Sequence, residues 1–179
     1  MRRTVFVLIF LLTAGFDQGT KEWALSLPVP AGCDVPADLV AHACHGIPQP
    51  VIQGYWDWEL AMNTGAAFSS LDFGNATQIL LAIFAAIAVA GIGFYAYRLR
   101  PDQRLERIAL GLVAGGALGN LIDRIRHGGV TDFIRWRIGE HRWPIFNVAD
   151  AALLVGVVLM FVAGALAHRR QRLRAPSTA

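Results

Sequence analysis

The sequence predicts an all-α membrane protein, a four-transmembrane-helix bundle with a small periplasmic β element and an interfacial segment. Only 16% of the 179 residues are charged, whereas a typical soluble domain carries about 25%. Hydrophobic residues make up 55% of the chain and fall into long runs, as they do in integral membrane proteins. We therefore expect residues 1–179 to form a single integral membrane domain.

Four apolar runs give the predicted spans, at about residues 4–25, 76–97, 107–123 and 148–167. Crossing the hydrocarbon takes roughly 20 residues. The second and fourth runs meet this length, and the second carries no charge. The third is short and rich in glycine, and the first is interrupted by Asp17, Lys21 and Glu22, so both need polar ends to complete the crossing.

The first run also has features of a secretory signal peptide, because Arg2 and Arg3 precede a short apolar stretch from Val5 to Leu12. No small-x-small cleavage site follows before Asp17, and the segment reaches spanning length at Leu25. We expect it to be retained as the first helix.

The distribution of arginine predicts the orientation, because cytoplasmic loops carry an excess of Lys and Arg. The N-terminus, the loop between the second and third spans and the C-terminal tail share one side and hold ten basic residues. On the other side, the loop at 26–75 holds none, but the loop at 124–147 holds five, which conflicts with the rule. The balance predicts cytoplasmic termini and places both of these loops in the periplasm.

The loop at 26–75 combines helix-breaking residues with an alternating segment. Pro28, Pro30, Gly32 and Pro36 argue against a continuous helix. The aromatic, alternating run from Gln53 to Phe68 predicts one or two short strands at the membrane surface.

The two cysteines of the chain, Cys33 and Cys44, lie in this same loop. In an oxidising periplasm we expect them to form a disulfide. A metal site is the alternative, because His42 and His45 flank Cys44, but the spacing matches no strong zinc pattern.

The loop at 124–147 is rich in aromatic residues. Between residues 133 and 147, Phe, Trp and Ile are interleaved with arginines that could reach lipid headgroups. We expect an interfacial element here, and the alternative is a plain connection in water.

Two carboxylates beside the spans, Asp132 and Asp150, are the candidates for chemistry. A charged residue at the centre of a membrane helix costs about 2.5–3.5 kcal/mol on insertion scales, so such residues are rarely kept without a function. Two carboxyl groups held close together cannot both ionise easily, so one can activate water while the other donates a proton. The pair suggests acid/base chemistry on a lipid-associated substrate.

Other polar residues share faces with these acids. Asn120, Asp123 and Arg124 lie at i, i+3 and i+4 near the end of the third span, and Asn147 precedes Asp150 by three residues. Antiparallel packing of the third and fourth spans would bring these faces together near the outer surface.

A purely structural interpretation is also open, in which the acids only hold the bundle together. It would pair acids with nearby arginines: Asp123, Asp132 and Asp150 with Arg124, Arg126 and Arg135. Asp17 and Lys21, at i and i+4 on the first span, are expected to neutralise each other.

A face for close helix packing is predicted by three glycines of the third span: Gly111, Gly115 and Gly119.

Five blocks of sequence occur in a specific order between residues 17 and 150. They are Asp17-Gln18-x-x-Lys21, Asn63-Thr64-Gly65-Ala66-Ala67-Phe68, Gly115-Gly116-Ala117-Leu118-Gly119-Asn120-Leu121-Ile122-Asp123-Arg124, Gly129-Val130-Thr131-Asp132-Phe133 and Phe146-Asn147-x-Ala149-Asp150. Together these blocks resemble the motifs of bacterial lipoprotein signal peptidase, also called signal peptidase II.

The resemblance implies an inner-membrane aspartyl endopeptidase that removes signal peptides from prolipoproteins, cutting before a cysteine that already carries diacylglycerol. It implies that Asp132 and Asp150 form the catalytic dyad and that water is activated without a metal or other cofactor. Asp123 is the rival for a catalytic place, but its neighbour Arg124 suggests a supporting salt bridge. The other motif residues would orient the substrate or support the dyad: Asp17, Lys21, Asn63, Gly65, Asn120, Asp123, Arg124 and Asn147.

The same resemblance implies a multi-pass protein of the bacterial cell inner membrane with its active site toward the periplasm. Its partners would be prolipoproteins and membrane lipids, with no nucleic acid, and we expect a monomer. Compared with the family, the stretch from Lys21 to Asn63 is long. The insertion, at about residues 26–52, contains both cysteines.

Two non-enzymatic classes remain as alternatives. Polar groups inside spans also occur in proton-relay or transport bundles, although a transporter more typically shows repeat symmetry. A structural or assembly bundle is the other alternative, and it should tolerate loss of either carboxylate.

Overall fold

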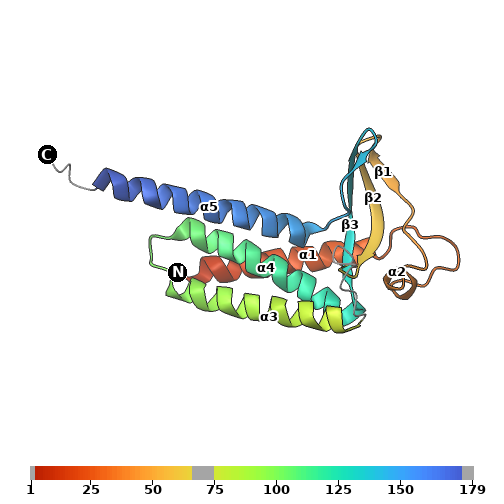
Figure 1. Ribbon diagram of the computed structural model, residues 1–179, viewed down its shortest axis with the longest axis horizontal. Coiled ribbons are helices and arrows are strands. Elements are labelled where there is room, and N and C mark those ends of the chain that lie inside the picture. Colours follow the sequence, from red (N-terminus) through yellow and green to blue (C-terminus); the bar gives the residue numbers. More distant parts are fainter. Residues whose placement is uncertain (1–2, 66–74, 175–179) are drawn as a thin grey trace.

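The computed structural model describes residues 3–65 and 75–174. Four long helices lie side by side, and a small sheet stands across one end of them (Figure 1). These helices are α1 (Arg3–Ala24), α3 (Asn75–Arg98), α4 (Arg104–His127) and α5 (Val148–Arg174). The other elements are the one-turn helix α2 (Ala37–Val40) and the strands β1 (Gln49–Ile52), β2 (Trp56–Asn63), β3 (Val130–Ile138) and β4 (His141–Arg142).

Three helices in the described part of the chain are long and apolar enough to cross a membrane. They comprise Ala76–Arg98, Arg104–His127 and Val148–Arg170. The predicted helix at 4–25 is present as α1, with 22 residues, but its last two turns carry Asp17, Lys21 and Glu22. By length and composition, α3, α4 and α5 are therefore the candidate spans.

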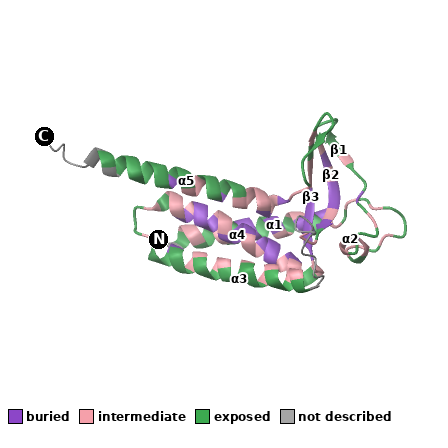
Figure 2. Cartoon of the chain, in the orientation of Figure 1, coloured by how far each residue is buried: buried purple, intermediate pink, exposed green. Residues whose placement is uncertain are grey.

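Helix α4 forms the centre of the bundle. In the most apolar segment of α4, 56% of the residues are buried within the protein, whereas the buried share of the corresponding segment is 17% in α5 and 6% in α3. It contacts α1, α3 and α5, and the buried residues of Figure 2 concentrate on α4 and on the sheet. The exposed apolar side chains of α3 and α5 are suited to contact with lipid tails.

The predicted glycine face of α4 packs on α1. A Cβ added at Gly115 would lie 2.6 Å from the Cβ of Thr13, and one added at Gly111 would lie 2.9 Å from the Cβ of Ile9. A Cβ at Gly119 would overlap the Asp17 carboxylate. The absence of side chains at these positions lets the two helices approach closely.

Helices α3, α4 and α5 are longer than the predicted spans, whereas α1 has the predicted length of 22 residues. The third span is predicted to end at residue 123, whereas α4 continues to His127. It ends at Gly128, which has φ +72° and donates its N–H to the Arg124 carbonyl oxygen at 3.1 Å. Asp123 and Arg124 thus lie within the helix rather than at its end.

The sheet is antiparallel, with the order β1-β2-β3-β4. Strand β2 lies within the predicted strand segment at 53–68, of which residues 66–68 lie outside the described residues. Strands β3 and β4 lie in the loop at 124–147, for which the sequence predicts an interfacial element and not strands. Arginines alternate there with large apolar residues, and this period of two fits a strand with two different faces.

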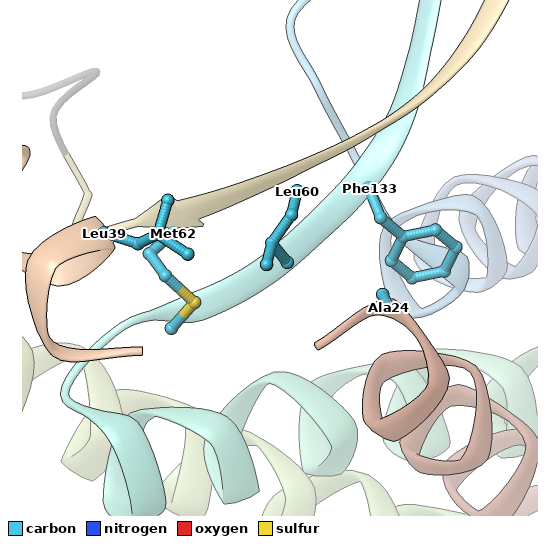
Figure 3. Packing of buried hydrophobic residues seen from close by; sticks show 5 residues of the cluster. All are labelled: Ala24, Leu39, Leu60, Met62 and Phe133. Carbon is cyan, nitrogen blue, oxygen red and sulfur yellow. The ribbon is translucent and has the colours of Figure 1, made fainter. Parts of the chain in front are cut away.

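The loop between α1 and β1 packs on the sheet. The predicted disulfide joins Cys33 and Cys44, so neither sulfur is a free thiolate for the alternative metal site. Leu39 of α2 belongs to the same buried cluster as Leu60 and Met62 of β2. Figure 3 shows this cluster continuing along the sheet to Phe133 and, on α1, Ala24.

Candidate active site

Strand pairing sets the position of Asp132. Strands β2 and β3 run antiparallel, with Ala61 opposite Asp132 and Asn63 opposite Val130. Asn63 Nδ2 donates to Asp132 Oδ2 at 3.1 Å. The N–H of Gly65, a glycine with φ +81°, donates to Asn63 Oδ1 at 2.9 Å and so fixes this amide.

Asn147 connects Asp132 with Asp150. It directly precedes α5, and its Oδ1 accepts the Asp150 N–H at 2.9 Å while its own N–H donates to Asp150 Oδ2 at 3.2 Å. This reciprocal pair is a capping box at the start of the helix. Asn147 Nδ2 also donates to Asp132 Oδ1 at 2.6 Å. One buried residue therefore holds the carboxyl groups of β3 and α5 beside each other.

Asn120 of α4 supports Asp150 from the bundle. Its Nδ2 donates to Asp150 Oδ1 at 2.9 Å, and its Oδ1 accepts from Lys21 Nζ at 2.8 Å and from Asn147 Nδ2 at 3.2 Å. An ammonium group can only donate, so Lys21 fixes which end of the Asn120 amide faces Asp150.

Lys21 is itself held between two acids. Its Nζ lies 2.9 Å from Asp17 Oδ2 and 3.4 Å from Asp123 Oδ2, and all three side chains are buried. The predicted pairing of Asp17 with Lys21 is therefore present. Asp17 also accepts the Ala149 N–H at 2.8 Å, and Asp123 accepts the Thr131 N–H at 2.8 Å. These bonds tie α1 to the start of α5, and α4 to β3.

Gln18 is a polar member of this network for which the sequence predicts no role. Its Nε2 lies 3.1 Å from Asp123 Oδ1, 3.2 Å from the Gly119 carbonyl oxygen and 3.4 Å from Asp17 Oδ2. Its place beside Asp17 in the first sequence block is the signal that could have identified it.

Arg124 does not make the predicted salt bridge with Asp123. Adjacent residues on a helix point in different directions, and the salt-bridge partner of Asp123 is Lys21. The Arg124 Nη1 donates to the main-chain oxygen of Asn120 at 3.3 Å, and its buried Nε has no hydrogen-bond partner among the described residues. Among the described residues, its guanidinium therefore forms no salt bridge with a carboxylate.

In the part of the chain that the structure describes, the arginine pairs of the purely structural interpretation are absent for Asp132 and Asp150. Arg126 pairs with a glutamate of α1, and Arg135 pairs with a glutamate of β2. Within residues 3–65 and 75–174, neither Asp132 nor Asp150 takes part in a salt bridge. Their partners are amides and main-chain N–H groups instead.

The surroundings of Asp132 favour its protonated form. Burial raises the pKa of this carboxyl group to about 7, and the charge of Asp150 contributes in the same direction. The hydrogen bonds from Asn63 and Asn147 act against this increase because they stabilise the carboxylate. Near neutral pH the site can therefore hold one proton beside one charged carboxylate, as general acid and base catalysis requires.

All of these polar residues lie at one level of the molecule. Asp17 and Lys21 lie in the last two turns of α1, Asn120 and Asp123 lie near the end of α4, and Asp150 lies in the first turn of α5. They meet where the sheet stands across the bundle (Figure 1). A cluster confined to one end is unlike the transmembrane substrate path expected of a transporter.

Comparison with known proteins gives consistent matches over most of the chain. A family model described as signal peptidase (SPase) II matches residues 9–166. The lipoprotein signal peptidase of Xanthomonas euvesicatoria pv. vesicatoria is 38% identical over 162 residues, covering 89% of this chain and 85% of that protein. That of Xylella fastidiosa is 39% identical over 157 residues, covering 86% of this chain and 84% of that protein.

Two solved structures share the fold. A bacterial membrane enzyme determined by the in meso method at 2.3 Å resolution has a TM-score of 0.68 and 27% identity, covering 97% of this chain and 94% of that one. A second, determined by the same method at 1.9 Å resolution, has a TM-score of 0.64 and 29% identity, covering 88% and 90%.

Proposed function

This chain belongs to the signal peptidase II family, and on that basis we propose that Asp132 and Asp150 are its catalytic dyad. The family consists of aspartic-type peptidases that remove signal peptides from prolipoproteins, so the chain is a hydrolase of this kind. The observation that carries the proposal is the position of Asn147, which donates a hydrogen bond to each of the two carboxyl groups. The proposed substrate is a prolipoprotein whose cysteine carries diacylglycerol.

The proposed reaction uses one proton shared by the pair. Asp150, as the carboxylate, accepts a proton from water while the water oxygen attacks the scissile carbonyl carbon. Asp132, as the acid, donates its proton to the carbonyl oxygen, which gives a neutral gem-diol. Asp150 then protonates the leaving nitrogen as the C–N bond breaks, and Asp132 recovers its proton from the gem-diol hydroxyl.

The surrounding amides keep the dyad aligned. Asn63, fixed by Gly65, supports Asp132, and Asn120, fixed by Lys21, supports Asp150. We assign the remaining donors of Arg124 to the substrate backbone, because among the described residues this guanidinium forms no salt bridge and no hydrogen bond with a carboxylate. The dyad and its supports come from one chain, so the proposed working unit is a monomer.

The apolar helices and the family fit a protein of the bacterial inner membrane. We propose four spans, with α1 completed by its buried Asp17–Lys21 pair, cytoplasmic termini and the dyad toward the periplasm. The arginines of the loop at 124–147 conflict with this orientation, and three of the five are paired with acids in the folded protein. Arg126 pairs with Glu22 at 2.5 Å, Arg137 with Asp57 at 3.0 Å, and Arg135 pairs with a buried glutamate.

The decisive experiment replaces each acid by its isosteric amide. Asp132→Asn and Asp150→Asn should each lower cleavage of a diacylglyceryl-modified precursor by at least about 10³-fold, because each removes a proton acceptor or donor. Released signal peptide from purified protein is the measurement, with thermal unfolding in detergent as the check on folding.

Asp123→Asn is the matched control, because it makes the same chemical change on a neighbouring acid. It should lower the unfolding temperature, since Asp123 pairs with buried Lys21, while leaving cleavage measurable. Near-normal cleavage by either dyad variant would reject the dyad. Loss of cleavage in Asp123→Asn without loss of stability would make Asp123 the catalytic acid instead.

A further inference from the structure

A cavity of about 440 Å³ lies at the end of the bundle away from the acidic cluster. Its walls are formed by the loop between α3 and α4, the first turn of α4 and the C-terminal part of α5. In Figure 1 this loop lies at the opposite end of the helices from the sheet. Leu166 in the cavity wall follows Asp150 by 16 residues on α5, which is about 24 Å at 1.5 Å per residue. The cavity is therefore separate from the active site.

The cavity has one apolar wall and a basic rim. On α5, Ala163, Leu166 and Ala167 lie on one helix face, and Arg170 follows one turn later on the same face. Arg104 lines the cavity from the start of α4. Both arginines are the terminal residues of apolar spans, Arg104–His127 and Val148–Arg170, so they lie at the depth of lipid headgroups.

Two of the cavity's arginines have no acidic partner in the described part of the chain. Arg100 lies 4.0 Å from Asp102, but both side chains are about three-quarters exposed, so this pair is weak. The other acid in the wall, Glu106, accepts a hydrogen bond from Gln103 at 3.4 Å. Neither Arg104 nor Arg170 forms a salt bridge with a described residue, which leaves two guanidinium groups for an anion.

The loop beside the cavity is held in a fixed conformation. Arg107, which is 4% exposed, donates to the main-chain oxygens of Leu99 at 3.0 Å, Arg100 at 2.5 Å and Pro101 at 3.2 Å. Gln103 Oε1 accepts the Arg100 N–H at 2.9 Å. Because the hydrogen bonds of buried Arg107 fix the loop that lines the cavity, a ligand would meet a preorganised wall.

We propose that this cavity binds the headgroup of an anionic membrane phospholipid, with Arg104 and Arg170 donating to its phosphate. Guanidinium groups match the geometry of phosphate oxygens. Basic pockets between membrane helices are a recurring form of lipid recognition. The apolar face of Ala163, Leu166 and Ala167 would lie along the start of an acyl chain. This binding does not depend on the dyad.

The test titrates the full-length protein in detergent with phosphatidylglycerol and follows its thermal unfolding, because a ligand that binds the folded state raises the unfolding temperature. The double variant Arg104→Gln/Arg170→Gln should need at least about tenfold more lipid for the same increase, since it loses two charge-assisted hydrogen-bond donors. The matched control, Arg169→Gln/Arg172→Gln, removes the same charge from exposed α5 residues outside the cavity and should respond like the wild type.

Two further arms identify the ligand. Phosphatidylcholine should stabilise the wild type much less than phosphatidylglycerol, and inorganic phosphate alone should not reproduce the effect. An equal response of the double variant and the wild type, or of the two lipids, would overturn the proposal. A response to inorganic phosphate equal to that of the lipid would also overturn it, because the site would then bind a free anion. Arg170→Gln alone changes only an exposed side chain, so a smaller lipid response in this variant supports the proposal even if the double variant fails to fold.

Discussion

Lys21 shows how one residue can organise an active site without touching the reaction. Its buried ammonium group contacts Asp17, Asp123 and Asn120 together. A buried charge is tolerated only when it is paired and hydrogen-bonded, and these contacts meet that requirement. Through Asn120 the positive charge fixes the amide that supports Asp150. Lys21 is thus a positioning residue.

The pH dependence of cleavage should reflect the proton on Asp132. The reaction needs this acid protonated, and its pKa is raised to about 7 by burial. As the pH rises through that value the donor is lost, so the rate should fall about tenfold per pH unit above it. In a purified assay, a rate that is flat from pH 6 to pH 9 would contradict this assignment.

Asn63→Ala should move this alkaline limb to higher pH. The Asn63 hydrogen bond stabilises the Asp132 carboxylate, so its removal raises the pKa further. The measurement is the midpoint of the normalised rate profile, with Gln49→Ala, which removes a half-buried side-chain amide outside the site, as control. An unchanged or lower midpoint would argue against Asp132 as the proton donor.

At the residue scale, sequence reasoning brought together most of the cluster. The i, i+3 relation of Asn147 and Asp150 appears as a capping box, and the i, i+4 relation of Asp17 and Lys21 appears as an ion pair. It assigned no role to Gln18, although this residue stands beside Asp17 in the first sequence block. Its contacts with Asp123 cross about a hundred residues of sequence and depend on how α1 and α4 pack.

At the scale of elements, the glycines of α4 let the neighbouring helices approach closely, because they have no side chains. Its glycine face sits against α1, while on another side a Cβ at Gly116 would lie 2.5 Å from the Ala149 carbonyl oxygen of α5. These close approaches bring the Lys21 and Asn147 networks within hydrogen-bonding distance of Asn120. Helix packing therefore sets the geometry of Asp150 and its supports, whereas strand pairing positions Asp132.

Hydropathy could predict the four long helices, because each contains an apolar run, although the third run is short and the first is interrupted by charged residues. It could not predict strands β3 and β4, because aromatic residues alternating with arginine also suit an interfacial segment. Pairing with β2 favours the strand over an irregular interfacial segment. Asp57 lies opposite Arg135 in the register, and Arg137 donates to Asp57 at 3.0 Å. The strand that carries Asp132 was thus the element least visible in the sequence.

Gly119→Ala should destabilise the protein and slow cleavage. The added methyl would overlap the Asp17 carboxylate and push α1 from α4, which costs about 1–3 kcal/mol for an overpacked contact. Unfolding in detergent and precursor cleavage are the measurements. Gly91→Ala on α3 is the matched control, because a methyl there meets nothing within 4 Å and should leave both unchanged or raise stability slightly. Equal behaviour of the two variants would mean that the α1–α4 contact is looser than the structure shows.

At the scale of the whole molecule, polarity is divided between two ends. Acids and amides gather beside the sheet, whereas the arginines around the cavity gather at the far end (Figure 1). The loop between α1 and β1 adds Leu39 to the buried cluster that contains Met62, the residue before Asn63. The sequence could not predict how this loop packs, because its packing depends on contacts with β2 that no local pattern encodes.

The proposed orientation makes these two ends chemically distinguishable in cells. Glu140→Cys, in the exposed turn between β3 and β4, should react with a membrane-impermeant maleimide in spheroplasts, because the sheet would face the periplasm. Asp102→Cys, exposed in the loop between α3 and α4, should react only after the membrane is permeabilised. The native cysteines are joined in a disulfide, so the unaltered protein should remain unlabelled without reductant and provide the background. Labelling of Asp102→Cys from outside, with Glu140→Cys protected, would invert the topology and place the dyad on the side where prolipoproteins are made, before their export.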